Sequence, residues 1–211
     1  FIMSTAIYNL SSSLNNKLYS DIMMKFRHAA ENLVAADYGV FNGRAMKISN
    51  IPIAFSSAMA AAIIPTVSQL VARRQLADAR DKTAQAVKTI MLISIPSAVG
   101  LFALAKPITW LLFPDEDTIE LATRILMALS VSIIFYALST LSNSILQGIG
   151  RVNTPIVNAA IALLLQTAVL VLILCFTDLG IYGVVIATIV YSGLMCVLNQ
   201  MSMHKALGYR Q

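Results

Sequence analysis

The chain has little charge. Only 12% of its 211 residues are Asp, Glu, Lys or Arg, about half the share found in soluble domains, whereas 58% are apolar and the mean hydropathy is +0.76. So few charged side chains could not coat the surface of a soluble domain. The composition therefore excludes a disordered chain and a nucleic-acid-binding domain, and it indicates a protein embedded in a lipid bilayer.

Cysteine and catalytic motifs are equally scarce. The only two cysteines, Cys175 and Cys196, lie inside apolar runs, which is typical of buried, unreactive thiols and not of a disulfide scaffold. The only two histidines, His28 and His204, lie near the ends of apolar runs, and the chain contains no HExxH motif, Walker loop or paired intramembrane acids. We therefore expect no enzymatic activity, no metal site and no cofactor.

Long apolar runs are what the chain does contain. Runs of 20 or more residues are too long for the strands of a membrane barrel and predict transmembrane helices. A charged connection at residues 73–82 is expected to begin as an amphipathic helix, and no linker divides the chain into two domains. The sequence thus predicts an all-α fold, one bundle of six transmembrane helices over residues 1–211, at about residues 1–24, 38–70, 87–112, 119–146, 155–176 and 181–203.

The charges of the connections predict an orientation. Basic residues flank alternate connections and acidic residues lie in the others, and basic connections stay in the cytoplasm. Six spans then place both ends of the chain in the cytoplasm, provided that the polar first segment crosses the bilayer. Because the chain begins inside a helical segment, at Phe1, without a signal peptide, we expect a fragment that lacks its N-terminal part. The basic set is Arg73, Arg74, Arg80, Lys82, Lys88, Arg151, Lys205 and Arg210, and the acidic set is Asp115, Glu116, Asp117 and Asp178.

Two cations within the second span are candidates for function. Arg44 and Lys47 are three residues apart, and neither has an acid within four positions on the same helix. On an ideal helix they share one arc with Asn50. Two buried cations without a counter-ion would cost several kcal/mol, so this arc is expected to line a wet cavity, where the two groups suit a phosphate. The alternative is that both only anchor the helix at the outer headgroups. Small side chains continue the arc at Ala54, Ser57, Ala58 and Ala61.

Other polar residues interrupt the apolar runs. Those of the first segment either line a cavity or form interhelical hydrogen bonds, and those of the fourth and fifth spans favour such bonds. The acid of the first segment, Asp21, is expected to pair with Lys17. The polar positions are Asn9, Ser12, Asn15 and Asn16 in the first segment, then Asn143 and Gln147, then Asn158 and Gln166.

Prolines mark the places where the spans could bend. Pro52 and Pro65 lie in the second span and Pro96 in the third. Proline removes a backbone donor and clashes with the preceding turn. The second span is long enough to cross with tilt or with a break, for which Pro52 and Pro65 mark the places, and we expect hinges at all three positions.

Specific stretches resemble a known family. Residues 43–54 and 60–68 resemble the eighth span of flippases in the multidrug/oligosaccharidyl-lipid/polysaccharide superfamily, with the closest likeness to its polysaccharide biosynthesis and stage V sporulation protein B branch, which is related to the lipid II flippases. Residues 95–101 with 105–108 look like the ninth span. Residues 146–151, with Pro155, resemble the glycine turn between the tenth and eleventh spans.

This resemblance implies the second six-helix lobe of a two-lobe, MATE-like transporter whose central cavity opens alternately to each side. It further implies that Arg44 is a cavity arginine, that Lys47 stands where those flippases often have an acid, and that the carboxylates some relatives use for sodium are unmatched. The expected function is a plasma-membrane flippase or exporter of lipid-linked oligosaccharides on polyprenyl pyrophosphate, in which Arg44, Lys47, Asn50 and Asn9 bind substrate. The expected partners are the substrate, the lipid bilayer and the missing N-terminal lobe, with no nucleic acid.

Three other functions stay open. A multidrug or cation antiporter would share the fold but would need an acidic site. A membrane-embedded glycan transferase would need catalytic acids or histidine at the membrane surface. A purely structural assembly protein would not respond to removal of the charge of Arg44.

Overall fold

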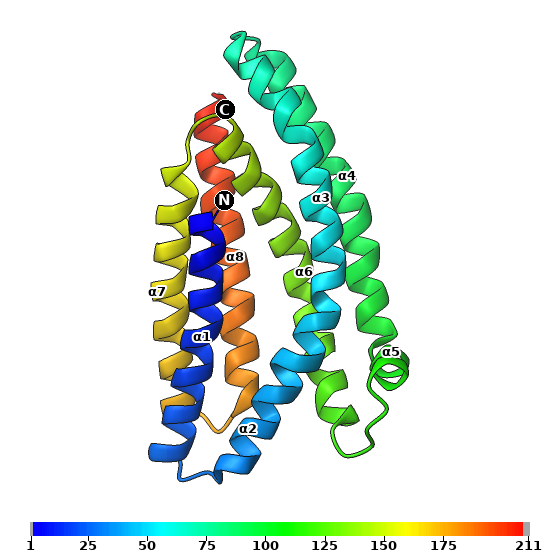
Figure 1. Ribbon diagram of the computed structural model, residues 1–211, viewed down its shortest axis with the longest axis vertical. Coiled ribbons are helices and arrows are strands. Elements are labelled where there is room, and N and C mark those ends of the chain that lie inside the picture. The colour runs from blue at the N-terminus through cyan, green and yellow to red at the C-terminus, as the bar shows by residue number, and fades with distance from the viewer. Residues whose placement is uncertain (1, 209–211) are drawn as a thin grey trace.

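The structure, a computed structural model, describes the chain from residue 2 to residue 208, with side chains from Ser11 onward. Every regular element of this described part is helical (Figure 1). The elements are α1 (Ile2–Lys25), α2 (Glu31–Val40), the π-helix η1 (Phe41–Ala45), α3 (Met46–Ala72), α4 (Leu76–Ala103), α5 (Ala105–Leu112), α6 (Ile119–Gly148), α7 (Asn153–Phe176) and α8 (Ile181–Leu207).

The lengths and apolar composition of the helices confirm a multi-pass membrane protein. Within the described residues, five helical stretches are long and apolar enough to cross a bilayer. The first helix, α1, is 24 residues long and would extend about 36 Å, but it is not among those five. The predicted count of six spans is therefore not established by length and composition. The five stretches are Glu31–Ala72, Leu76–Ala103, Ile119–Gly148, Asn153–Phe176 and Ile181–Leu207.

The helices form two groups joined by α6. Figure 1 shows α1, α7 and α8 standing together on one side and α3 and α4 on the other, with α6 running obliquely between them. Helix α6 packs against α8, α3 and α4. In the apolar windows of both α6 and α8, 56% of residues are buried, against 22% in Glu31–Ala72 and in Leu76–Ala103. The core therefore follows α6 and α8, and the outer helices keep faces for lipid or for another part of the protein.

The second predicted span begins earlier and bends elsewhere than expected. Helical structure runs without interruption from Glu31 to Ala72, and α3 continues through both Pro52 and Pro65, so of the two alternatives, tilt or a break at these prolines, the break is excluded. The irregular turn is η1, where the amide of Met46 donates to the carbonyl of Phe41, five residues back. Proline is tolerated inside a transmembrane helix because neighbouring groups satisfy the freed carbonyl.

The third predicted span is two helices. Helix α4 begins at Leu76, which confirms the helical start of the charged connection, and it ends at Ala103. The short helix α5 follows and is seen nearly end-on in Figure 1, out of line with α4. Pro107 supplies the reason, because it has no amide to donate to the carbonyl of Ala103 and sits in the first turn of α5, where proline is accepted.

Polar side chains connect the helices at two levels. Gln166 in α7 donates to Asn15 in α1 at 2.8 Å, and Asn158 in α7 donates to Asn199 in α8 at 2.9 Å. These contacts confirm the prediction of interhelical hydrogen bonds for Gln166 and Asn158. Gln147 instead donates to Asn143 within α6, at 2.9 Å.

The end of the bundle that carries the charged connection at residues 73–82 is closely packed where α3 meets α6. The hydroxyl of Ser68 donates to the carbonyl of Gly148 at 2.7 Å. A Cβ atom at Gly148 would lie 2.7 Å from Cγ2 of Ile64, closer than side chains tolerate. Glycine at position 148 therefore permits the approach of the two helices, and Gly150, with φ of +85°, then turns the chain toward α7.

Candidate functional site

Arg44 lies in η1, and its guanidinium group contacts the connection between α5 and α6. Its Nη2 donates to Oδ2 of Asp115 at 2.6 Å and its Nη1 donates to Oγ1 of Thr118. The hydroxyl of Thr118 donates in turn to the same carboxylate oxygen at 2.8 Å. The three side chains thus close a ring of hydrogen bonds between residues 71 positions apart. The expectation of an unpaired Arg44 is therefore wrong, because the acid comes from another element.

Aromatic packing completes this cluster. The guanidinium carbon of Arg44 lies 5.8 Å from the ring centroid of Phe113, within the range of a cation–π contact. The side chain of Arg44 is 23% exposed and that of Asp115 is 40% exposed. We call Arg44, Phe113, Asp115 and Thr118 the Arg44 cluster. It is shielded on the side of Arg44 and open to solvent on the side of Asp115.

The electrostatics of the cluster favour the ion pair. The hydrogen bond from Arg44 lowers the pKa of the Asp115 carboxyl below its usual value, and the hydroxyl of Thr118 contributes in the same direction. Asp115 is therefore charged at neutral pH. The net charge of the pair is close to zero, so an approaching anion meets a neutral group rather than a free cation.

Lys47 and Asn50 have a different environment. Both side chains are exposed, and no hydrogen bond or ion pair joins either of them to another side chain in the described range. The small residues of the predicted arc are exposed as well. The arc therefore exists as a surface from Lys47 onward, and the guanidinium of Arg44 beside it donates to Asp115 and Thr118. We call this surface the α3 face; its residues are Lys47, Asn50, Ala54, Ser57, Ala58 and Ala61.

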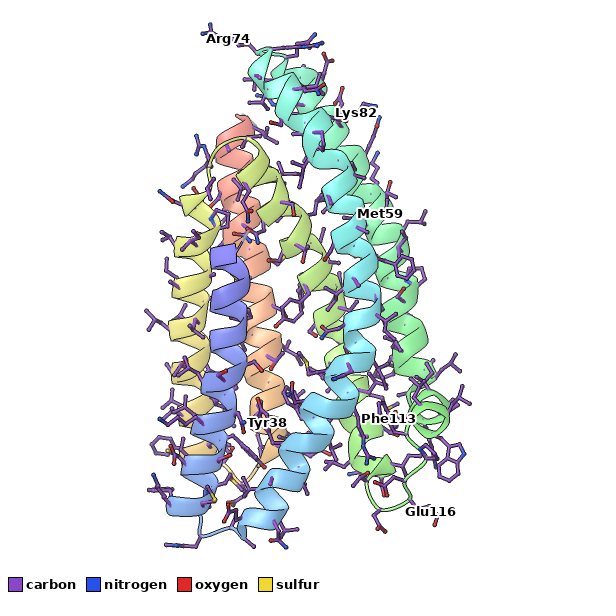
Figure 2. All side chains as sticks on the ribbon, viewed as in Figure 1. Tyr38, Met59, Arg74, Lys82, Phe113 and Glu116 are labelled. Atoms are coloured by element: carbon purple, nitrogen blue, oxygen red, sulfur yellow. The ribbon has the colours of Figure 1, made fainter. Side chains whose placement is uncertain are left out.

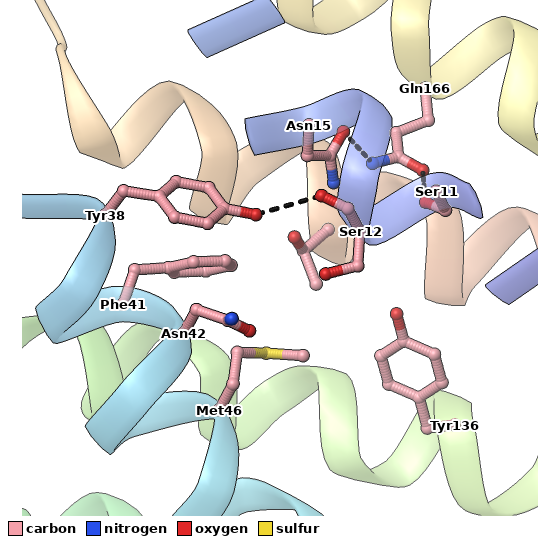
Figure 3. Close-up of a pocket in the computed structure, with 10 residues that line it drawn as sticks. Ser11, Ser12, Asn15, Tyr38, Phe41, Asn42, Met46, Tyr136 and Gln166 are labelled. Carbon is pink, nitrogen blue, oxygen red and sulfur yellow. Dashed lines mark hydrogen bonds between the residues drawn. The ribbon is translucent and has the colours of Figure 1, made fainter. Parts of the chain in front are cut away.

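A polar pocket lies between the two groups of helices (Figure 3). Its volume is about 20 Å³, room for about one water molecule. Amide, hydroxyl and aromatic side chains line it without any charged residue. Ser11 donates to Gln166 at 3.0 Å, and the hydroxyl of Tyr38 donates to the backbone oxygen of Ser12 at 3.0 Å. The lining residues are Ser11, Ser12 and Asn15 of α1, Tyr38 of α2, Phe41 and Asn42 of η1, Met46 of α3, Tyr136 of α6, Gln166 of α7 and Thr188 of α8.

The pocket accounts for part of the polar face predicted for the first segment. Asn15 is buried and bonded to Gln166, whereas Asn16 is exposed. The predicted substrate residue Asn9 lies among residues whose side chains are outside the described part. The ion pair of Asp21 is with Lys25, at 2.9 Å, and the predicted partner Lys17 adds only a weaker electrostatic interaction.

Charge is divided between the two ends of the bundle. Figure 2 shows Arg74 and Lys82 at one end and Glu116 at the other. Helix α1 begins and α8 ends toward the basic end (Figure 1). The basic connection at residues 73–82 and the acidic connection at residues 114–117 thus lie at opposite ends, although Arg27 also lies at the acidic end, where it pairs with Asp178. The side of the membrane that each end faces stays a prediction. Among residues 11–208, no group of three His, Cys, Asp or Glu side chains could hold a metal ion.

Sequence reasoning missed the partners of Arg44. Asp115 belonged to an acidic connection that was interpreted only as a topology signal. The predicted topology puts Arg44 near the outer part of its span and the acidic connection on the outer side. Their similar depth is the signal that could have suggested the pair.

The sequence of the chain matches a known protein family. A sequence profile described as "Lipid II flippase MurJ" matches residues 45–211, well over half of the chain. The chain belongs to the lipid II flippase MurJ family. It is also similar to the lipid II flippase MurJ of Bacillus subtilis (strain 168), with 27% identity over 122 residues, which are 57% of this chain and 22% of that protein.

Solved structures show the same fold. A MATE protein in the bent conformation superposes with a TM-score of 0.80 at 16% identity, over 97% of this chain and 44% of that one. An inward-facing multidrug resistance MATE family transporter of the MOP superfamily gives 0.80 at 18% identity, over 97% and 46%. The chain thus has the fold of part of a MATE-like transporter, and it spans less than half the length of the structures it matches and about a fifth of the curated relative.

Proposed function

We propose that the chain forms one half of a transporter that moves a lipid-linked saccharide, carried on polyprenyl pyrophosphate, across the plasma membrane by alternating access. Membership of the lipid II flippase MurJ family is the observation that carries this proposal. The family description names a transporter, and the proposal accordingly assigns no catalytic group to the chain.

The proposed substrate path follows the α3 face. Lys47 and Asn50 are exposed there without partners in the described range, and the small side chains beyond them leave room for saccharides. Arg44, one helical turn before Lys47, supplies a planar fork of donors that suits a phosphate, and Lys47 adds a compact point charge. Asn9 of α1 is proposed to contact the saccharide from the other side of the path.

The proposed topology has six spans, with α1 as the first. Figure 1 shows α1 lying along α7 over most of its length, and Gln166 of α7 bonds to it in the middle. By the distribution of basic residues the end that carries Arg74 is cytoplasmic and the end that carries Glu116 is outer. Pro52, Pro65 and Pro96 are proposed as positions where α3 and α4 bend during the transport cycle.

A multidrug or cation antiporter of the same fold is the second candidate, and the MATE neighbours fit it. Cationic drugs need an acidic site. The polar pocket and the α3 face contain no carboxylate in the described part of the chain, which favours the flippase.

Substitution of Arg44 tests the proposal. In the complete protein reconstituted in vesicles, Arg44→Ala should reduce translocation of a fluorescent polyprenyl-pyrophosphate saccharide at least tenfold, the equivalent of one charge-assisted hydrogen bond of about 1.5–3 kcal/mol. Arg44→Lys should restore flux only partly, because the charge returns without the fork of donors. Lys47→Ala should be milder, because Arg44 remains.

The matched control is Arg124→Ala. Arg124 is also an arginine paired with one acid, Glu120 in the preceding turn of α6, but its side chain is 63% exposed and it lies outside the Arg44 cluster. Its removal should leave flux unchanged. Near-wild-type flux in Arg44→Ala, at equal expression and equal melting temperature, would overturn the proposed substrate role.

A further inference from the structure

Two of the five N–H donors of Arg44 are already engaged within the Arg44 cluster. Nη2 donates to Asp115 and Nη1 donates to Thr118. A phosphate that binds the two Nη atoms at this same edge of the guanidinium would need these donors, whereas Nε and the second hydrogen of each Nη are not used by the cluster. The ring of Phe113 packs against the guanidinium. An anion bound at this edge must therefore take the place of the Asp115 carboxylate.

Asp115 is placed so that it can exchange. It lies in the connection between α5 and α6 rather than in a helix, and its side chain is 40% exposed, against 23% for Arg44. It can leave toward solvent while the arginine stays. A pyrophosphate carries more negative charge than one carboxylate and brings more acceptor oxygens, so it competes well for the same donors.

We propose that Asp115 is a built-in competitor of the substrate for Arg44: the lipid-linked pyrophosphate displaces the carboxylate on binding, and the carboxylate recaptures the arginine on release. This inference rests on the proposed function. Without this competition Arg44 would bind the pyrophosphate more tightly and release it more slowly. A carboxylate at the acidic end of the bundle lowers that affinity where the proposed topology puts the exit, and it gives Arg44 a counter-ion whenever no pyrophosphate is bound.

Thr118 has a positioning role in this exchange. Its hydroxyl accepts from Arg44 and donates to Asp115, so it aligns the carboxylate with the guanidinium. When Asp115 leaves, Thr118 stays at the first residue before α6 and can still accept from Arg44. The side chain that exchanges is therefore Asp115, and Thr118 determines how well it competes.

The experiment compares Asp115→Asn with Glu116→Gln in the complete protein. Both remove one negative charge from the same connection, but Glu116 makes no contact with Arg44 among the described contacts. With a fluorescent polyprenyl-pyrophosphate saccharide in vesicles, Asp115→Asn should lower the apparent KM by roughly three- to tenfold, up to the size of one charge-assisted hydrogen bond. It should also lower the maximal rate, because release slows. Glu116→Gln should change neither.

A second variant and a binding measurement keep the test decisive. Thr118→Val keeps the branched shape and removes the hydroxyl, so it should shift KM in the same direction by a smaller factor. Inorganic pyrophosphate should bind Asp115→Asn more tightly than wild type in detergent, and the added Arg44→Ala substitution should abolish that gain. Thr118→Val alone should also bind inorganic pyrophosphate more tightly than wild type. This measurement tests the inference even if Asp115→Asn fails to fold.

The outcomes separate this inference from the proposed function. If Arg44→Ala abolishes flux while Asp115→Asn and Thr118→Val match Glu116→Gln in KM, the flippase proposal stands and the competitor role is overturned. If Arg44→Ala transports normally, the proposed function itself falls. Lower KM and lower maximal rate in Asp115→Asn, beside a defective Arg44→Ala, support both.

Discussion

Asn158 of α7 donates its side-chain amide to the side-chain oxygen of Asn199 of α8 at 2.9 Å, and Asn199 donates in turn to Ser139 of α6 at 3.3 Å. Asn199 has no exposed surface. These three side chains thus link α6, α7 and α8 by hydrogen bonds. In buried surroundings an interhelical hydrogen bond specifies which faces of the helices meet.

Replacing Asn199 should destabilise the bundle. Asn199→Ala removes the bonds that Asn199 makes to Asn158 and Ser139, and the amide of Asn158 keeps only its bond to Ser202 at 3.1 Å. A buried group that loses its partner costs about 1–3 kcal/mol. We expect a lower melting temperature in detergent. Asn143→Ala is the control, because the bond recorded for Asn143 stays within α6, and it should shift the melting temperature less. Equal shifts for the two variants would contradict an interhelical role for Asn199.

Arg27 should determine how firmly α1 is attached. Its Nε donates to the carbonyl of Leu174 at 3.2 Å and its Nη2 to that of Thr177 at 2.7 Å, while Nη1 pairs with Asp178. Arg27 therefore satisfies carbonyl oxygens at the end of α7 that have no amide partner within the helix. Arg27→Ala should increase hydrogen exchange in the last turn of α7 and in the connection between α1 and α2.

The control for Arg27 is Lys25. It pairs with Asp21 in its own helix, and its side chain is 78% exposed. Because an exposed ion pair contributes little to stability, Lys25→Ala should change hydrogen exchange little. If Arg27→Ala and Lys25→Ala gave the same exchange pattern, the attachment of α1 would depend on packing alone.

The Arg44 cluster should resist mild acid. Arg44 lowers the pKa of Asp115, and a carboxyl with a lowered pKa stabilises the folded chain above its unfolded pKa of about 3.9 and loses that effect as the pH falls through the folded value. The contact should therefore persist from neutral pH to about pH 4 and break only below it. A fluorophore at Glu116→Cys should report this transition, and the same label in an Asp115→Asn background should not. A transition near pH 6 would implicate a different group.

The orientation of the bundle can be measured directly. In a background with Cys175 and Cys196 replaced by alanine, Lys82→Cys should react with a membrane-impermeant maleimide only from the cytoplasmic side, and Glu116→Cys only from outside. The two positions lie at opposite ends of the bundle (Figure 2). Reaction of both from one side would rule out the six-span topology.

The sequence predicted the helices well where one signal dominated. Residues 119–146, 155–176 and 181–203 were expected as spans, and α6, α7 and α8 contain them, because long apolar runs between Gly- and Asp-containing turns have no competing solution. Gln166 and Asn158 were expected to bond between helices for a similar reason, since a buried amide in an apolar run must find a partner.

The prediction failed where the structure depends on contacts between residues far apart in the sequence or on the geometry of a turn. Nothing local to Arg44 shows that Asp115 neutralises it, because the two residues meet only after α4 and α5 have folded back. Pro107 lies inside an apolar run, where the sequence alone does not distinguish a proline that separates two helices from a proline inside one helix. The π-helical turn at Phe41–Ala45 has no proline and no other marked feature apart from Gly43.

The π-helical turn also determines the angular position of the residues that precede it. A π turn holds one residue more than an α turn, so everything before η1 is rotated by about one residue step, 100°, relative to an unbroken helix. Deleting one residue from η1 would restore a regular helix and turn Tyr38 away from Tyr19, whose ring centroid lies 6.0 Å from its own. The length of this segment therefore matters as much as its chemistry: a substitution changes one side chain, whereas a one-residue deletion would misalign the whole of α2.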